Sequence, residues 1–188
     1  MPHIHDKENQ HDFTASAFIV RTDFDEPRLM LHEHKKVGLF MQAGGHVELE
    51  ENLWQAISHE LLEETGYDLS QLQILQPKQF RIKHLSNSVV HPVPIVQNTH
   101  LYMPGVSTHK HIDTVYGFIT DQAPAKKPNE DESQNIIWVT LAELKAFDPL
   151  KITANAKEIG EAMLNIFIKE WEALPLSDFE TMKSGRRI

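Results

Sequence analysis

The sequence predicts an α/β fold with a strand-rich body and two longer helices. Segments rich in β-branched and aromatic residues recur along most of the chain, starting with residues 13–21 (FTASAFIVR), and this pattern is typical of strands. Residues 53–65 and 153–173 instead carry apolar side chains at helical spacing. The chain has 188 residues and shows no internal repeat, so we expect residues 1–188 to form a single domain.

The first third of the chain is expected to contain a loose start, two strands and a helix. Residues 1–12 are polar and are expected to be a loose N-terminus. Strands are expected where β-forming residues cluster, at residues 13–21 and 29–34, and residues 39–42 lead into the double glycine. The helix over residues 53–65 is expected to end at Gly66, because glycine is common immediately after the last helical residue.

The middle of the chain is more extended, and helices return near its end. Short strands are expected at residues 72–75, 79–84, 113–120 and 136–140. Residues 91–103 (HPVPIVQNTHLYM) contain two prolines, which exclude a helix and restrict any strand there to a sheet edge. Residues 141–147 begin a small helix, and the spacing of apolar residues predicts a C-terminal helix over residues 153–173.

The composition excludes several classes of protein and site. The absence of cysteine excludes disulfides, zinc sites with thiolate ligands and cysteine nucleophiles, and it is typical of a reducing, cytoplasmic location. No apolar run approaches the roughly 18 residues of a membrane span. A formal net charge of −9 disfavours a surface that coats nucleic acid, although it permits a small nucleotide substrate. The sequence is compatible with a homodimer.

Three glutamates, Glu60, Glu63 and Glu64, lie at positions i, i+3 and i+4 near the end of the expected helix. At about 100° per residue, this spacing places all three on one stripe of the helix. The three carboxylates repel one another, and the helix dipole disfavours anions at this end. The stripe therefore needs a compensating positive charge. A hard divalent cation such as Mg²⁺ is the simplest candidate, because it binds one or two carboxylates together with substrate phosphates.

The acidic stripe belongs to a longer pattern over residues 44–67. Gly45 is followed after five residues by Glu51, and after seven more by residues 59–67 (HELLEETGY). This spacing resembles the Nudix box, which reads Gly, five residues, Glu, seven residues and Arg-Glu-U-x-Glu-Glu-x-Gly-U, where U is aliphatic or aromatic. The alternative is a solvated amphipathic helix, which explains the apolar stripe but not the glycines, Glu51 and the terminal acids together.

The resemblance implies a fold, a reaction and a metal. Nudix proteins are α/β/α sandwiches with a mixed β-sheet, and Nudix enzymes use Mg²⁺ or Mn²⁺ to hydrolyse a diphosphate linked to another moiety, usually a nucleoside. Transferred to this sequence, the resemblance makes Glu60 and Glu64 metal ligands and adds the Gly44 carbonyl as a further ligand. Glu63 becomes the third acid of the catalytic cluster, and Glu51 orients the loop before the helix or supports the cluster.

The resemblance leaves the general base open. Some members of the family use a glutamate of the box, and others use an acid on a distant loop. In this sequence Glu130, Asp131 and Glu132 lie in the polar linker before the strand at residues 136–140. Glu132 is the first candidate to reach the metal site, while a solvated run of charge is the alternative for all three.

His59 is the position at which this sequence departs from the box, because the family has arginine there. The arginine bridges acids and backbone and so keeps the glutamates in place. Imidazole is shorter and titrates near pH 6.5, so a permanent cation becomes a conditional one. We therefore treat His59 as a catalytic-site residue whose charge decides how well the cluster is held.

Histidines elsewhere suggest further roles. His109, His111 and Asp113 alternate along an expected strand, so all three should point to one face. Three interpretations remain open, namely an independent zinc site, a polar strand face, and a lining of the substrate pocket. Arg81 is a candidate phosphate contact. His32, in another expected strand, is expected to be solvated.

The sequence thus predicts divalent-metal-dependent hydrolysis of a diphosphate linkage in a nucleoside diphosphate derivative. The expected partner is a small nucleotide-type substrate. The alternative is a nucleotide-binding or regulatory module that keeps the Nudix fold with little or no turnover, as the loss of the arginine would allow.

Overall fold

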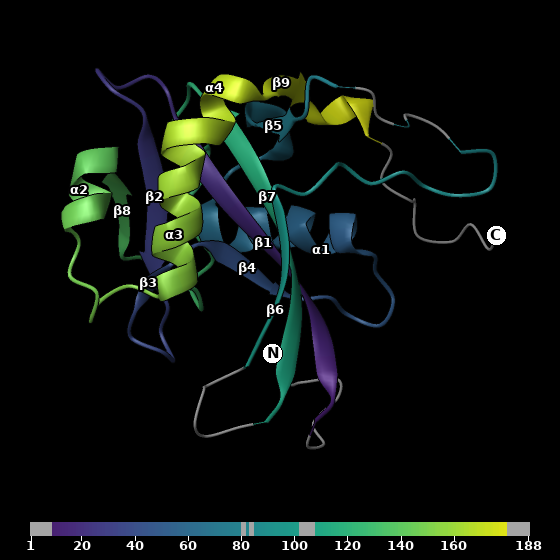
Figure 1. Ribbon diagram of the computed structural model, residues 1–188, viewed down its shortest axis with the longest axis horizontal. Helices are drawn as coiled ribbons and strands as arrows, with labels where there is room; N and C mark the ends of the chain where they lie inside the picture. Colours follow the sequence, from purple (N-terminus) through teal and green to yellow (C-terminus); the bar gives the residue numbers. More distant parts are fainter. Residues whose placement is uncertain (1–8, 80–81, 83–84, 102–107, 180–188) are drawn as a thin grey trace.

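A mixed sheet runs through the part of the chain that the structure describes, residues 9–79, 82, 85–101 and 108–179 of a computed structural model (Figure 1). Its main path has the strand order β3-β2-β1-β7-β5-β9, while β4 pairs with β1, β6 with β7 and β8 with β2. The strands are β1 (His11–Arg21), β2 (Arg28–Glu33), β3 (Phe40–Met41), β4 (Ala43–His46), β5 (Gln73–Gln76), β6 (Val96–Leu101), β7 (Lys110–Thr120), β8 (Ile136–Val139) and β9 (Glu172–Pro175).

The centre of the sheet is a parallel pair, β1 and β7, whose residues are in register from His11 opposite Lys110 to Arg21 opposite Thr120. The other pairs are antiparallel. Strand β4 lies along the N-terminal half of β1, with Gly44 opposite Ser16. The double glycine of the box is therefore part of the sheet.

Helices cover both faces of the sheet, with α3 in front and α1 behind it in the view of Figure 1. The helices are α1 (Leu53–Glu60), α2 (Leu141–Ala146), α3 (Ala154–Ala162) and α4 (Ile168–Glu170), and π-helical turns at Leu61–Thr65 and Met163–Phe167 follow α1 and α3. Because neighbouring strand residues point to opposite faces, Ala17 and Ile19 pack with Trp54 of α1, whereas Phe18 packs with Met163 on the other face. These two cores confirm the α/β/α sandwich.

On the α3 side of the sheet, the side chains of β1 are polar in its first half and apolar in its second half. Phe18 and Val20 are apolar, but Asp12, Thr14 and Ser16 continue the same alternation with buried polar side chains. We call these three residues, together with the neighbouring His111 and Asp113 of β7, the polar strand face.

The ends of the expected elements needed correction. Strand β1 begins at His11, inside the expected loose start, because it pairs with the beginning of β7. The C-terminal helix expected over residues 153–173 ends at Glu170, since Trp171 is extended and Glu172–Pro175 pairs with β5. Most of the strand expected at residues 79–84 lies outside the described residues. Within the described part of the chain, no helix has the length and apolar character needed to cross a membrane.

Candidate active site

The start of α1 is determined by local hydrogen bonds. The Asn52 side chain accepts hydrogen bonds from the backbone N–H groups of Trp54 and Gln55, at 2.9 and 3.0 Å, and the Gln55 side chain accepts from the Asn52 N–H at 2.9 Å. This reciprocal cap is worth about 1 kcal/mol or more. It begins the helix two residues after Glu51, so the front acid of the box lies in the loop and not on the helix.

The end of this helical segment is tied to the polar linker. Gly66 has a φ of +73°, and a Cβ there would lie 2.2 Å from the carbonyl oxygen of Lys126. The Lys126 N–H donates to the Gly66 carbonyl at 3.1 Å, and the Asn129 N–H donates to the Glu63 carbonyl at 2.8 Å. A glycine is therefore needed so that the linker can approach the helix end closely, and this approach brings Glu132 towards the box.

The three acids of the stripe occupy different environments. Glu60 and Glu64 are buried, with relative exposures of 4% and 6%, whereas Glu63 is only partly buried. The Gly44 N–H donates to Glu64 Oε2 at 2.7 Å. A Cβ on Gly45 would lie 2.0 Å from Glu60 Oε1, so the missing side chain of Gly45 makes room for the Glu60 carboxylate. Two carboxylates are thus packed against the double glycine.

Burial changes the chemistry of Glu64. Desolvation raises the pKa of the Glu64 carboxyl well above its ordinary value; the Gly44 hydrogen bond opposes this, and the charges of Glu60, Glu132 and Glu63 add to it. A site with this excess of buried acid favours a cation. The oxygen donors of Glu60 and Glu64 are of the kind that Mg²⁺ prefers, and they lie side by side at the glycines.

Among the described residues, no three histidine or acidic side chains lie close enough together to hold a metal ion by themselves. Two carboxylates nevertheless fit Mg²⁺, which usually keeps waters and takes further oxygens from substrate phosphates. The expected Gly44 carbonyl ligand stays a prediction.

His59 bridges the loop and the acid cluster. Its Nδ1 lies 2.9 Å from Glu51 Oε2, and its Nε2 lies 3.5 Å from Glu60 Oε1. Glu51 in turn accepts a hydrogen bond from the Glu48 N–H at 2.8 Å. The neighbouring carboxylates, Glu60 first and Glu51 after it, raise the pKa of His59 to about 9 against the opposing effect of burial. The imidazolium therefore lies between two acids of the box, at the position from which the arginine of the family is expected to bridge acids and backbone.

Among the three linker acids, Glu132 is the one turned towards the cluster. It is partly buried, and its charge contributes to the raised pKa of Glu64. Glu130 and Asp131 are exposed, and their backbone carbonyls accept hydrogen bonds from Lys35 Nζ. This placement supports the preference for Glu132, while its role in catalysis stays a prediction.

His32 is a site residue that the sequence analysis missed. It is 2% exposed, not solvated as expected. Its Nε2 lies 3.1 Å from the Gln42 carbonyl oxygen and 3.9 Å from Glu64 Oε2. Burial lowers the pKa of His32 to about 4, so the ring is neutral near pH 7 and donates through Nε2. His32 lies two residues after Met30, a core residue, and residues two apart on a strand point to the same face. This spacing was the sequence signal for the burial of His32.

The comparisons with known proteins agree with this geometry. A family model described as the NUDIX domain matches residues 12–162. The chain belongs to the Nudix family. As a member of this family, the protein is a Nudix-type pyrophosphohydrolase. The sequence comparison with curated proteins finds no match.

Solved structures show the Nudix fold in several relatives. A NUDIX-family hydrolase from Clostridium perfringens is 28% identical, with a TM-score of 0.67 over 82% of this chain and 97% of that one. An Ap4A hydrolase from C. elegans is 17% identical, with a TM-score of 0.55 over 84% and 96%. The NUDIX domain of Shewanella oneidensis NrtR, solved with ADP-ribose, is 12% identical, with a TM-score of 0.56 over 79% and 83%. The last two comparisons show the fold alone.

The structure places His111 of β7 on the polar strand face of this Nudix protein, and His109 lies just before the start of that strand. His109, His111 and Asp113 are all buried. His109 Nε2 lies 3.3 Å from Asp12 Oδ2, and Asp113 Oδ1 accepts hydrogen bonds from the hydroxyls of Thr14 and Ser16 at 3.0 Å each. Burial raises the pKa of Asp113. The independent zinc site gains no support from the described residues, and Arg81 lies outside them.

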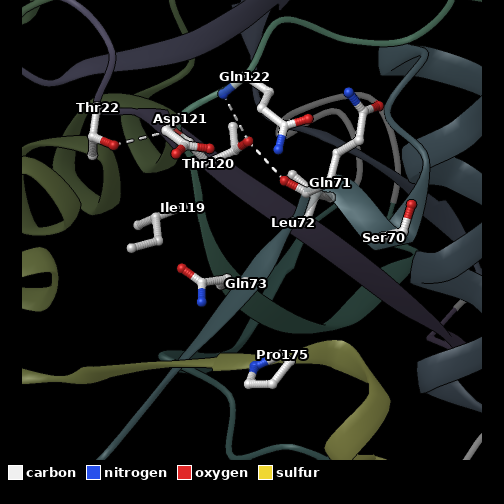
Figure 2. A pocket seen from close by; sticks show the side chains of 10 residues that line it. All are labelled: Thr22, Ser70, Gln71, Leu72, Gln73, Ile119, Thr120, Asp121, Gln122 and Pro175. Atoms are coloured by element: carbon white, nitrogen blue, oxygen red, sulfur yellow. Dashed lines mark hydrogen bonds between the residues drawn. The ribbon is translucent and has the colours of Figure 1, made fainter.

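A shallow pocket of about 410 Å³ lies at the other end of the central strands and is lined by Thr22, Gln71, Thr120 and their neighbours (Figure 2). Thr22 is six residues beyond Ser16, the partner of Gly44, which is roughly 20 Å along a strand. Several of its polar groups already bind one another; Thr120 Oγ1, for example, donates to the Gln71 carbonyl at 2.7 Å. This pocket is therefore separate from the Nudix site.

The bridging role of His59 predicts a pH-dependent stability. Because the folded-state pKa of about 9 is above the ordinary 6.5, the stabilisation by His59 is fully present below pH 6.5 and is lost as the pH rises through 9. In thermal melts with chelator, the parent should lose more stability from pH 6.5 to 9 than His59→Arg, which keeps its charge. His11→Arg, at an exposed histidine, should leave the parent's slope unchanged. Parallel curves for the parent and His59→Arg would show that His59 is a bystander.

Proposed function

We propose that this Nudix protein hydrolyses a diphosphate linkage in a nucleoside diphosphate derivative, using Mg²⁺ or Mn²⁺. The observation that carries the proposal is the pair of buried carboxylates, Glu60 and Glu64, packed against Gly44 and Gly45. Two buried acids at the surface of a glycine strand are costly unless a cation compensates them. A diphosphate is a ligand that brings such a cation with it.

In the proposed mechanism, Glu60 and Glu64 would hold the divalent cation, with the Gly44 carbonyl as a further oxygen ligand. The bound cation would neutralise the phosphate oxygens and make a water more acidic. His59, held by Glu51, keeps the Glu60 carboxylate in place. Glu63 or Glu132 would accept the proton of the attacking water, because both are near the cluster and more accessible than Glu60 and Glu64.

The substrate's nucleoside part is proposed to lie along the polar strand face, where His109 and His111 would line its pocket. His111 lies on β7, His109 lies just before it, β7 pairs with β1, and β1 pairs with the double glycine. Among the described strands β4 pairs with β1 alone, so a ligand bound at the acids on the α1 side would extend past this edge strand to reach the polar strand face. Arg81 remains a candidate phosphate contact from the sequence alone.

A second candidate is a Nudix-fold module that binds a nucleotide without efficient turnover. The replacement of the box arginine by His59 favours it, since the bridging charge becomes conditional. The structural relative solved with ADP-ribose is a Nudix domain seen with a bound ligand.

A substrate panel separates the two candidates. Nucleoside triphosphates, ADP-ribose and diadenosine polyphosphates would be incubated with Mg²⁺ or Mn²⁺, and phosphate release after phosphatase coupling would be measured. Turnover of any member at an ordinary rate of roughly 1 s⁻¹ or more supports the enzyme and excludes the binding module. Tight binding without turnover contradicts the proposed hydrolysis.

The incomplete protein ligand set predicts that metal binding depends on the substrate. Since the described residues place two buried carboxylates at the double glycine, Mg²⁺ affinity should rise at least about tenfold when diphosphate oxygens complete the shell. Calorimetry with and without a non-hydrolysable diphosphate measures the difference. Equal affinities in the two titrations would indicate a site made by the protein alone, against this expectation.

A further inference from the structure

We propose that Gln42 is a specificity-determining residue, whose side-chain oxygen accepts a hydrogen bond from the nucleoside part of the substrate. The inference rests on the proposed function, because it assumes a nucleotide-type ligand at the acid cluster. The ligand group can be an N–H of the base or an O–H of the sugar, and these two donors share the same chemistry.

The main chain of Gln42 lies beside the acid cluster. It connects β3 to β4, and its backbone carbonyl accepts a hydrogen bond from His32 Nε2 at 3.1 Å. The same nitrogen of His32 lies 3.9 Å from Glu64 Oε2. Two residues later, the Gly44 N–H binds Glu64 itself. The main chain of Gln42 is thus tied to the metal side of the strand, while its side chain reaches the polar strand face.

Hydrogen bonds fix the orientation of the Gln42 amide. Ser16 Oγ donates to Asp113 Oδ1 at 3.0 Å, and Thr14 Oγ1 donates to the same oxygen at 3.0 Å. Because its proton is committed to Asp113, Ser16 Oγ can only accept from Gln42, which it does from Nε2 at 3.2 Å. The nitrogen end of the amide must therefore face Ser16, and Oε1 faces away from it.

The Oε1 atom of Gln42 is buried and accepts no hydrogen bond from the described residues. A buried acceptor without a donor costs free energy, and such atoms are rare in folded proteins. Here the network of Asp113, Ser16 and Thr14 holds the amide in this arrangement. The result is an oriented acceptor at the polar strand face, where the nucleoside part of the substrate is proposed to lie, and a donor group on the ligand would satisfy it.

The test combines two variants with methylated substrates. Gln42→Met keeps the length of the side chain and removes the acceptor, and Gln42→Glu keeps acceptor oxygens. Gln97→Met is the matched control, because Gln97 is an exposed glutamine of β6 whose amide is 3.5 Å from Thr114. Each protein would be assayed on the best substrate of the panel and on analogues methylated at the base nitrogens, at the 2′-oxygen or at the 3′-oxygen.

We expect methylation of the substrate and the Gln42→Met substitution each to lower kcat/KM, and we expect the two together to lower it no further than either one alone. One analogue should lower kcat/KM of the parent by about 10- to 100-fold, mainly through KM, and Gln42→Met should lose as much on the natural substrate. Gln42→Met should lose nothing further on that analogue, which also identifies the donor as base or sugar. Gln42→Glu should retain more of the discrimination than Gln42→Met, and Gln97→Met should behave as the parent. If the loss of kcat/KM from Gln42→Met and the loss from methylation multiply for every analogue, the inference is overturned.

Stability and binding keep the outcome interpretable. Gln42→Met removes the unsatisfied acceptor but also the hydrogen bond from Nε2 to Ser16 Oγ, so its melting temperature should change little. An equal loss of kcat/KM on the natural substrate and on every analogue would mark a purely structural Gln42 and contradict the inference. If the panel shows no turnover, calorimetry with ADP, GDP, CDP, UDP and their methylated forms replaces the kinetics. If Gln42→Met changes which methylated nucleotide binds but no substrate is turned over, the inference is supported and the proposed hydrolysis fails. If substrates are turned over and Gln42→Met does not change the preference among analogues, the hydrolysis is supported and the inference fails.

Discussion

Glu64→Gln is expected to lower kcat by about a thousandfold, since loss of a metal ligand removes several kcal/mol of transition-state stabilisation. The fold should remain intact, because the amide oxygen of the introduced glutamine can still accept the hydrogen bond that the Gly44 N–H now donates to Glu64 at 2.7 Å. Steady-state kinetics with saturating Mg²⁺ measures the effect. Glu158→Gln, at an exposed glutamate of α3, is the matched control and should keep the parent's activity.

The same substitution has a consequence for stability that works in the opposite direction. The pKa of Glu64 is raised by burial, so its ionisation opposes folding, and metal-free stability should fall as the pH rises above the ordinary value of 4.5. Glu64→Gln should lack this part of the fall, and its melting temperature in chelator near pH 7 should be equal or higher. A lower melting temperature, or near-parental activity in both Glu64→Gln and Glu63→Gln, would contradict the assignment of the site.

Gly45→Ala is expected to lower kcat/KM about a hundredfold with little change in melting temperature. The added Cβ would lie 2.0 Å from Glu60 Oε1, so the carboxylate must move, and a displacement of about 1 Å at a reacting centre can cost 10²-fold. The cost in stability should be small, because the atom that must move is the end of a flexible side chain. Kinetics and thermal melts on the same preparation measure both quantities.

Two other glycines make this prediction specific. Gly44→Ala would place a Cβ 2.3 Å from the Ala15 carbonyl, at a φ of +143°, so it should destabilise the fold by about 3 kcal/mol. Gly38→Ala has a φ of +68° but nothing within 4 Å of its Cβ, so it should cost only about 1 kcal/mol and leave activity unchanged. A Gly45→Ala variant with parental kcat/KM would show that Glu60 does not need its present position.

The fold was predictable where its signals are local. Strands β1, β2, β7 and β8 lie close to the residues expected for them, because alternating and β-branched patterns report on the two faces of a sheet. The end of the C-terminal helix was not predictable in this way. Trp171 continues the helical spacing, but the pairing of Glu172–Pro175 with β5 ends the helix at Glu170, and that pairing joins segments about 100 residues apart.

The candidate site shows the same division. The spacing of Gly45, Glu51 and the terminal glutamates identified the box from a single segment, and the family match over residues 12–162 confirms it. The roles of the individual residues stay predictions. His32 and Gln42 were not found, because the pairing of β2 with β1 brings His32 to Glu64, and the pairing of β4 with β1 brings Gln42 to Ser16.

The sequence by itself determined which acids gather at the end of one helix, since their spacing along 24 residues is a local property of the chain. Only the tertiary structure decided which acids are buried and what lies next to them. Glu60 and Glu64 are enclosed because β4 presents two residues without side chains to the helix, and Glu132 approaches because Gly66 lets the linker pass closely. Burial depends on segments that are distant in sequence, and burial is what raises the pKa of Glu64 and leaves the site in need of a cation.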